Sequence, residues 1–207
     1  MAAPTTKNIH DLDGKWVWNR QLSDPFGEIL EIQGVNAVIR KTMNLASLAI
    51  HKREYRGPPA PGGKKSDEPP LAPPVPAEVW HLDCKHVMTG GLKATTEVRC
   101  FDGQVREIGD WIFGTMYTKN LLLDFAELLS LDTFLKGTEK RGPWLDEGEL
   151  IFTEASSPSG WVVTQIWGFQ MVDVRGNMER RLARNIVAKR NKDGKRANVR
   201  LVYDWGG

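Results

Sequence analysis

Residues 13–46 read DGKWVWNRQLSDPFGEILEIQGVNAVIRKTMNLA, and this stretch sets the fold that the rest of the chain must complete. Its first part alternates tryptophans with other side chains in a β-rich run, which is typical of a strand. Ser23-Asp24-Pro25 then offers a capping side chain followed by proline at the first helical position, so a helix is predicted to begin near Pro25. Apolar residues afterwards recur at steps of three and four, with an interruption at Gly34. The stretch therefore predicts a strand followed by two short helices.

The composition is that of an ordinary globular protein. The chain has 207 residues, of which 41% are hydrophobic and 26% are charged, and its length favours one domain over residues 1–207. A net charge of +2 gives no bulk reason to expect nucleic acid or an anionic membrane as a partner. Eight tryptophans are many for this length, and they suit either a pocket wall or a core.

The N-terminal residues MAAPTTKNIHDL show neither the basic start nor the apolar run of a secretory signal. The chain also has no uninterrupted apolar segment that approaches the roughly 18 residues of a membrane span. We therefore expect a soluble cytoplasmic protein. Cys84 and Cys100 are expected to be free thiols, because a hairpin turn at 89–91 would not bring them face to face.

The rest of the chain alternates in the manner of successive β-strands separated by turn residues. The predicted strands after the helices are 48–55, 79–88, 92–101, 104–111, 112–118, 149–156, 161–174, 178–190 and 196–205. With the first strand this gives roughly nine or ten strands at regular spacing. A meander of this kind avoids exposed edges most simply by closing into an antiparallel up-and-down barrel, so the fold class is predicted to be mainly β.

Two segments interrupt the strand pattern. Residues 57–76 hold eight of the 12 prolines and cannot join a sheet ladder, so a flexible proline-rich surface loop is predicted there. Residues 121–137, LLLDFAELLSLDTFLKG, space their leucines as an amphipathic helix would and predict a helical insertion. This insertion would either pack on the outside of the barrel or act as a lid over a ligand entrance.

Short motifs at both ends of the chain resemble those of a known superfamily. Gly14-Lys15-Trp16 is similar to the G-x-W of the first strand of calycins, which include the lipocalins and the intracellular fatty-acid-binding proteins. Residues 34–41, GVNAVIRK, are similar to the G-V-x-x-x-x-R-K of the helix-turn-helix in the fatty-acid-binding proteins, and Val202-Tyr203 resembles the R-V-Y near their C-terminus. The chain also resembles uncharacterised fungal lipocalin-like proteins. The resemblance implies a barrel that holds an apolar ligand and is capped by the two helices.

One departure from the family pattern affects the expected ligand. The arginine that holds a fatty-acid carboxylate in that family, together with a tyrosine two residues later, corresponds here to Leu201, whereas the tyrosine is kept as Tyr203. Arg200 has the opposite parity and should point outward if Leu201 points inward. The loss of a charge-assisted contact argues against a free fatty acid as the ligand. A larger and less acidic hydrophobic molecule is expected instead.

The candidate site residues lie mainly on strand positions predicted to face the cavity. Gln165 and Trp167 share one strand face and Leu201 and Tyr203 share another. If Tyr203 faces the cavity, as the resemblance implies, these residues would place an amide and a phenol among apolar walls. The predicted ligand-binding residues are Trp167, Leu201, Tyr203, Gln165, Val38 and Arg184, and the predicted catalytic residues are Tyr203 and Gln165. Alternatively, Trp167 and Tyr203 simply fill a barrel core.

Charged residues on other strands allow two interpretations each. Arg180 and Arg184 share a parity that Arg181 does not, and one of the three would be either an internal anion anchor or, as is more usual, a solvated exterior residue. Glu97 and Arg99 also share a parity, and a surface ion pair is favoured over an acid and donor that act across the barrel.

The sequence lacks the motifs of metal- or cofactor-dependent chemistry. His81 and Asp83 share a strand face that His86 does not, and no cysteine-pair or histidine-pair spacing favours a zinc site. A Ser-His-Asp order, a glycine-rich phosphate loop and an H-E-x-x-H motif are all missing. We therefore expect neither a metal nor a cofactor.

Two classes of function fit these observations. The first is a cofactor-free isomerase or cyclase acting on a polyketide- or terpenoid-like intermediate of secondary metabolism, because a shaped apolar cavity with one or two hydrogen bonds suffices for such chemistry. The second is a non-catalytic intracellular carrier of a lipophilic or fatty-acid-like molecule. The predicted lid, the polar Gln165 and Tyr203 and the missing arginine favour the first class.

Overall fold

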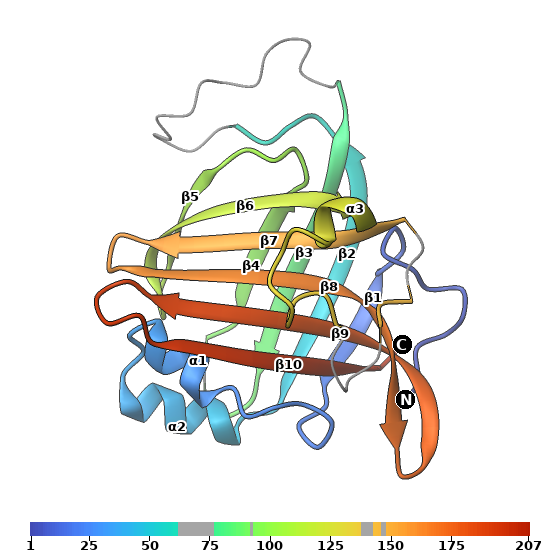
Figure 1. Ribbon diagram of the computed structural model, residues 1–207, viewed down its shortest axis with the longest axis horizontal. Helices are drawn as coiled ribbons and strands as arrows, with labels where there is room; N and C mark the ends of the chain where they lie inside the picture. The colour runs from blue at the N-terminus through green and yellow to red at the C-terminus, as the bar shows by residue number, and fades with distance from the viewer. Residues whose placement is uncertain (62–76, 92, 138–142, 146–147) are drawn as a thin grey trace.

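The fold is mainly β, as predicted, and is shown in Figure 1 by a computed structural model that describes residues 1–61, 77–91, 93–137, 143–145 and 148–207. Within these residues, ten strands and three helices follow one another. They are β1 (Gly14–Trp18), α1 (Gly27–Ile32), α2 (Ala37–Leu45), β2 (Leu48–Gly57), β3 (Val79–Met88), β4 (Thr95–Cys100), β5 (Arg106–Asp110), β6 (Gly114–Asp124), α3 (Phe125–Leu128), β7 (Glu149–Ser157), β8 (Trp161–Val174), β9 (Asn177–Arg190) and β10 (Arg196–Trp205).

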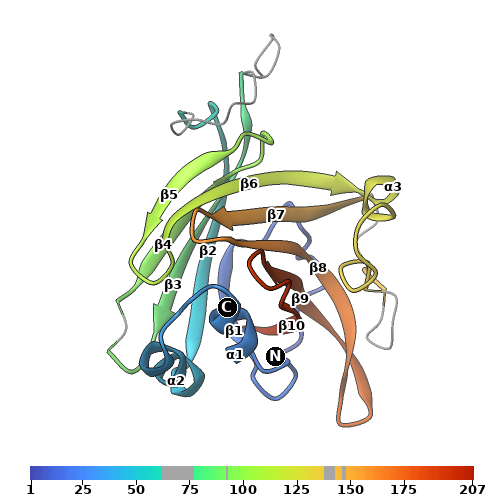
Figure 2. The same ribbon diagram turned by 60° about the vertical axis from the view of Figure 1, so that its left-hand side comes forward.

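All ten strands belong to one antiparallel sheet in the order β4-β3-β2-β1-β10-β9-β8-β7-β6-β5. Neighbours in the sheet are neighbours in the sequence except for β1 and β10, whose pairing brings the two ends of the chain together (Figure 1). The sheet curls around its concave face, and its hydrogen-bond ladder is left open between β4 and β5 within the described residues (Figure 2). The predicted antiparallel up-and-down barrel is therefore confirmed, with its ladder open between β4 and β5.

The G-x-W motif explains how the seam between β1 and β10 packs. Trp16 is fully buried, and its indole Nε1 donates a hydrogen bond of 2.8 Å to the Leu12 carbonyl oxygen. Gly14 has a φ of 126°, and a Cβ at this position would lie 2.3 Å from Cη2 of Trp205. Only glycine fits here, because the Trp205 ring occupies the space that any side chain would need. The motif thus fixes the close approach of the last strand to the first.

The helical pair follows β1 as predicted, but the predicted capping is wrong. The first helix begins at Gly27, and its N-cap residue Phe26 provides no side-chain hydrogen bond. The Ser23 hydroxyl instead accepts hydrogen bonds from Val202 N at 2.8 Å and Trp18 Nε1 at 2.9 Å. The serine therefore ties the chain to β10 rather than starting a helix. The second helix has the usual cap, since the Asn36 side chain accepts a hydrogen bond from Ile39 N.

The predicted insertion at 121–137 differs in both structure and place. Residues 121–124 continue β6, because they pair with β7, and the helix is limited to Phe125–Leu128. Leu128 and Leu135 belong to a second hydrophobic core with Leu150 and Ile166. Ile166 points to the opposite face of the sheet from its neighbour Trp167, which faces inward, so this core lies on the outer face. The segment therefore packs on the outside of the sheet, away from α1 and α2 (Figure 2). The interpretation as a lid is wrong, and the outside-packing alternative is confirmed.

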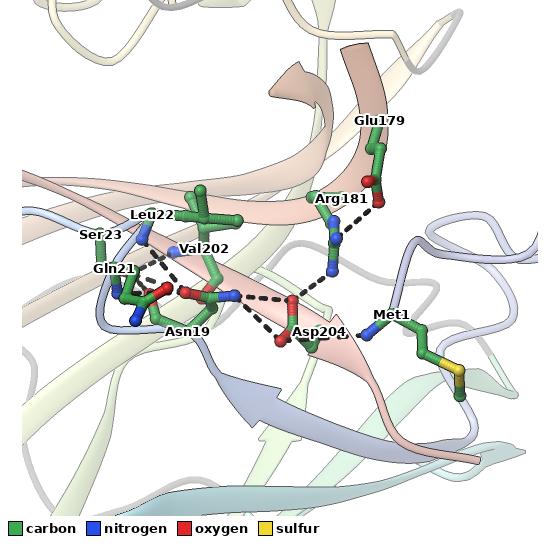
Figure 3. Close-up of polar contacts among 9 residues, drawn as sticks. All are labelled: Met1, Asn19, Gln21, Leu22, Ser23, Glu179, Arg181, Val202 and Asp204. Atoms are coloured by element: carbon green, nitrogen blue, oxygen red, sulfur yellow. Dashed lines mark hydrogen bonds and ion pairs between the residues drawn. The ribbon is translucent and has the colours of Figure 1, made fainter. Parts of the chain in front are cut away.

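A polar network covers the outside of the seam where the chain ends meet (Figure 3). The Asp204 carboxylate accepts hydrogen bonds of 3.1 and 3.0 Å from Asn19 Nδ2 and also contacts the buried Arg181 guanidinium, which in turn donates to Glu179 at 2.6 Å. The N-terminal ammonium of Met1 lies 3.9 Å from the same carboxylate. Arg181 is therefore a structural residue of the outer face, and it does not reach the interior.

Three further predictions concern single features. Cys84 and Cys100 are free and buried, as predicted, and the register sets them opposite Glu97 and His81 respectively. No helix among the described residues is long and apolar enough to span a membrane. The prediction of a flexible proline-rich loop at 57–76 falls mostly on 62–76, outside the described residues, and Gly57 itself ends β2.

Candidate ligand-binding cavity

The concave side of the sheet encloses a cavity of about 430 Å³. Its apolar wall includes Phe26, Ile29, Ile108, Phe113, Met116 and Val163, so α1 and the turn before it form part of the enclosure. Its polar lining includes Glu97, Arg99, Asn120, Thr153, Gln165 and Arg184. A second chamber of about 50 Å³ lies under the helical pair and is mostly apolar, with Trp18, Met43, Leu48, Leu201 and Tyr203 in its wall. Arg184 and Phe26 line both chambers.

A charged network crosses the interior from β4 to β7 and β6. Arg99 Nη2 lies 2.6 Å from Glu97 Oε2, and Arg99 Nη1 donates a hydrogen bond of 3.1 Å to Thr153 Oγ1. Thr153 Oγ1 in turn donates to Asn120 Oδ1 at 2.9 Å, and His86 Nδ1 lies 3.9 Å from Glu97 Oε1. Burial alone would raise the pKa of Glu97, but Arg99 and His86 outweigh it and lower the pKa to about 2. The favoured prediction of a surface pair is therefore wrong, because this ion pair lines the cavity.

Three cationic side chains surround one indole ring beside the cavity. Lys52 Nζ lies 4.1 Å from the ring centroid of Trp167, Arg184 Cζ lies 4.5 Å away and Arg99 Cζ lies 5.0 Å away. The Tyr203 ring stacks on the same indole with centroids 5.8 Å apart and an interplanar angle of 12°. Trp167 is only 1% exposed, so it acts as the central packing element around which the cations are arranged.

Burial shifts the pKa values of several of these groups. It lowers the pKa of Lys52, whose ammonium has the Cys84 sulfur at 3.8 Å, and it lowers the pKa of His86. Burial also raises the pKa of Tyr203, although the nearby Arg184 guanidinium opposes this. The contact between Tyr203 and Arg184 does not reach full hydrogen-bond geometry, and the phenol oxygen lacks a hydrogen-bond partner among the described residues. The interior thus contains a neutral phenol beside a permanent cation.

The structure brings most of the predicted site residues to the cavity region. Gln165 and Arg184 line the main chamber, and Leu201, Tyr203 and Arg184 line the smaller one. Trp167 lies beside them without lining either chamber. Val38 does not join this group, because it is 75% exposed on α2. The predicted catalytic pair is therefore divided between two adjoining chambers, and Arg184 links them.

Buried atoms without partners occur at several of these side chains. Within the described residues, the Gln165 amide oxygen, the Tyr203 hydroxyl, the Trp167 Nε1 and the Arg184 Nε are buried and form no hydrogen bond. Unpaired buried polar groups are costly, and they are common where a ligand or water completes the pairing. These atoms mark the polar part of the candidate site.

Lys52 was not predicted as a site residue, and the interior position of Glu97 and Arg99 corresponds to the less favoured of the two interpretations of that pair. A signal for Lys52 was present, since it shares the strand face of Leu48 and the fully buried Ile50. The leucine at position 201, in place of an arginine, does not leave the interior without positive charge. Cations on β2, β4 and β9 supply positive charge to the interior that β10 does not.

His81 and His86 make different contacts. The His81 ring stacks on Tyr55 at 4.8 Å and its Nε2 lies 3.0 Å from the Pro58 carbonyl oxygen, whereas His86 faces Glu97 in the interior. The described residues contain no cluster of three or more metal-ligating side chains. His86 is therefore better described as a member of the charged network.

Comparison with known proteins gives one similar curated sequence and several similar structures. No family model matches the chain. The chain is 28% identical over 209 residues to the probable pericyclase scpY of Mollisia scopiformis, and the alignment covers 100% of this chain and 95% of that protein. The REP1-NXSQ fatty acid transporter is 15% identical with a TM-score of 0.47, and it covers 95% of this chain and 96% of its own. As-p18, an extracellular fatty acid binding protein, is 13% identical with a TM-score of 0.38, and it covers 94% of this chain and 95% of its own.

Proposed function

We propose that this protein binds a hydrophobic polyketide- or terpenoid-like intermediate in the barrel cavity and, without a cofactor, accelerates its isomerisation or cyclisation. The observation that carries the proposal is the cavity of about 430 Å³, which combines an apolar wall with a few convergent polar groups. Small-molecule sites commonly have this size and composition. The polar groups would orient the ligand, and the apolar wall would select its shape.

Similarity to a probable pericyclase along the whole chain supports the class of reaction. A pericyclic step rearranges bonding electrons within one molecule, so it needs no oxidant, reductant or transferred group. A protein accelerates such a step by holding the substrate in a near-attack conformation and by stabilising charge that develops on a carbonyl oxygen. Both contributions are available from a preformed cavity with hydrogen-bond donors.

Four side chains have proposed roles at this site. The Arg184 guanidinium and the Gln165 side-chain amide border the main chamber and would donate hydrogen bonds to a substrate oxygen. The unpaired Tyr203 hydroxyl is the proposed donor at the boundary with the smaller chamber, where the apolar Leu201 would contact the end of the substrate. Removal of one such donor typically costs about a hundredfold or more in kcat.

A turnover assay tests this proposal directly. Purified protein in buffer with a chelator and without nucleotides is incubated with a linear intermediate from its own biosynthetic pathway, which the neighbouring genes identify, and the products are followed by mass spectrometry. We expect cyclised or isomerised product to form faster than in buffer alone. Tyr203→Phe and Gln165→Ala should both slow this conversion by about a hundredfold or more while the thermal unfolding curve stays unchanged. Lys192→Met, which removes an exposed charge in the β9–β10 turn, serves as the control.

The same assay separates the enzyme from a carrier. Saturable binding of the intermediate without any conversion would reject the catalytic proposal and leave an intracellular carrier of a lipophilic metabolite. If no hydrophobic molecule binds, both functions are rejected.

A further inference from the structure

We infer that the ligand of this cavity carries an anionic oxygen group, a carboxylate or an ionised enol, which pairs with Arg184 between the two chambers. The inference rests on the proposed function, because it names the chemical class of the molecule bound at the same site. It departs from the expectation drawn from Leu201 that the ligand is less acidic than a fatty acid.

The charge balance of the interior is the first step. Lys52, Arg99 and Arg184 lie within 5.0 Å of the Trp167 ring centroid, and Glu97 is the carboxylate that the structure sets among them. Glu97 is ion-paired with Arg99. Neither Lys52 nor Arg184 forms an ion pair with a carboxylate in the part of the chain that the structure describes. Glu54 also acts electrostatically on Lys52, so among the described residues these three cations face two carboxylates, and one positive charge remains in excess.

Arg184 is the cation best placed to meet a ligand. It lines both chambers, and its Nε is buried without a hydrogen-bond partner among the described residues. Lys52 lines neither chamber, and its ammonium already contacts the Cys84 sulfur and the Trp167 ring. Burial lowers the pKa of Lys52, whereas a guanidinium stays charged at any accessible pH. The excess charge that a ligand would meet is thus located on Arg184.

An anionic ligand group satisfies this arrangement better than a neutral one. A neutral apolar ligand would strip water from Arg184 and leave its charge unpaired, which is costly. An anionic oxygen would form charge-assisted hydrogen bonds with the guanidinium fork. It would also accept from the neutral Tyr203 phenol, whose oxygen has no partner in the described structure. The apolar wall remains free to hold the rest of the molecule.

Two fluorescent dyes that differ chiefly by one charged group test the inference. They are 8-anilino-1-naphthalenesulfonate, which is anionic, and N-phenyl-1-naphthylamine, which is neutral. We expect both to bind at one site and the anionic dye to bind at least about tenfold more tightly, because hydrogen bonds to charged groups are the stronger ones. Arg184→Met should abolish this preference by weakening the anionic dye about tenfold while the neutral dye changes less than about twofold.

Control variants keep the test specific. Lys85→Met removes a positive charge from an exposed position of β3 and should change neither affinity. Circular dichroism and thermal unfolding report whether each variant is folded, and Arg184→Gln replaces Arg184→Met if the latter unfolds. Displacement by dodecanoate identifies a carboxylate as the preferred group, and displacement by an ionised 2-acylcyclohexane-1,3-dione identifies an enolate. Dodecanol is the neutral competitor and should be the weakest of the three.

The outcomes separate this inference from the proposed function. Equal binding of the two dyes, or a charge preference that survives removal of Arg184, would overturn the anionic ligand while leaving the cavity as a binding site. Binding of neither dye would overturn the proposed function itself.

Discussion

Glu54 provides a sharp test of the electrostatics near the first strand. Its Oε1 accepts a hydrogen bond of 3.1 Å from Leu12 N, but its Oε2 is buried without a partner in the described structure. Burial raises the pKa of Glu54 from 4.5 to about 7; Leu12 N and Lys52 oppose the rise, and the Asp13 carboxylate adds to it. The carboxyl is therefore largely protonated in the folded protein below neutral pH and charged above it.

The direction of the stability effect follows from the two pKa values. Because the pKa is higher in the folded than in the unfolded chain, the stability gained from protonation is fully present below about pH 4.5 and is lost as the pH rises through about 7. The pKa difference corresponds to at most about 3 kcal/mol. Partial exposure of the side chain reduces this to about 1–2 kcal/mol. Glutamine has the shape of the protonated acid and keeps an acceptor for Leu12 N.

We therefore expect Glu54→Gln to raise the melting temperature by about 3–6 °C at pH 8.5 and to leave it nearly unchanged at pH 5. Thermal unfolding followed by circular dichroism between pH 5 and 9 measures the effect. Glu107→Gln, at an exposed position of β5, removes one carboxylate without burial and should give the same small change at every pH. An equal gain for Glu54→Gln at pH 5 and pH 8.5, or no gain at either, would refute this account of the buried carboxyl.

Three further substitutions test the packing and the interior network by thermal unfolding. Gly14→Ala should cost about 2–4 kcal/mol, because its Cβ would lie 2.3 Å from the Trp205 ring; a loss below about 1 kcal/mol would show that this approach is not tight. Arg99→Met should cost about 1–3 kcal/mol by leaving Glu97 unpaired, and the added change Glu97→Gln should recover part of it, whereas additive losses would contradict the pairing. Leu128→Ala should cost about 2–4 kcal/mol without changing dye affinity, and altered affinity would restore a role for its segment at the cavity.

Strands were predictable where alternation and turn residues agreed. The ranges predicted for β3, β8 and β10 match those in the structure, because each alternates strongly and ends at glycine-containing or polar turns. The error at 121–137 has a physical reason. Leu121 and Leu123 occupy a strand whose outer face is covered, so both of its faces are apolar and the alternation disappears. A leucine run of this kind cannot be told from a helix by its period.

The site was predictable in part, because parity identifies which side chains face inward but not which charges they meet. The resemblance pointed to Tyr203, alternation then gave Gln165 and Trp167 as its inward-facing partners, and all three are buried. Arg99 was assigned to the surface because a charged residue on a strand usually lies outside. Its interior position depends on Thr153, a partner 54 residues away in the sequence, and no local pattern reports such a contact.

The hydrogen bonds from Arg99 to Thr153 and from Thr153 to Asn120 both hold strands together and border the cavity. The backbone ladder of the sheet stops at β4 and at β5, so no main-chain hydrogen bonds join these strands within the described residues. The Arg99 side chain crosses from β4 to Thr153 on β7 and through it to Asn120 on β6, and all three side chains line the cavity. Because the same groups join β4 to β7 and β6 and border the cavity, an anion bound at Arg184 would act on the neighbouring Arg99 as well. If the proposed anion binds, it should therefore stabilise β4 and its side-chain contacts with β6 and β7 most, and amide hydrogen exchange should slow there more than in β1 and β10.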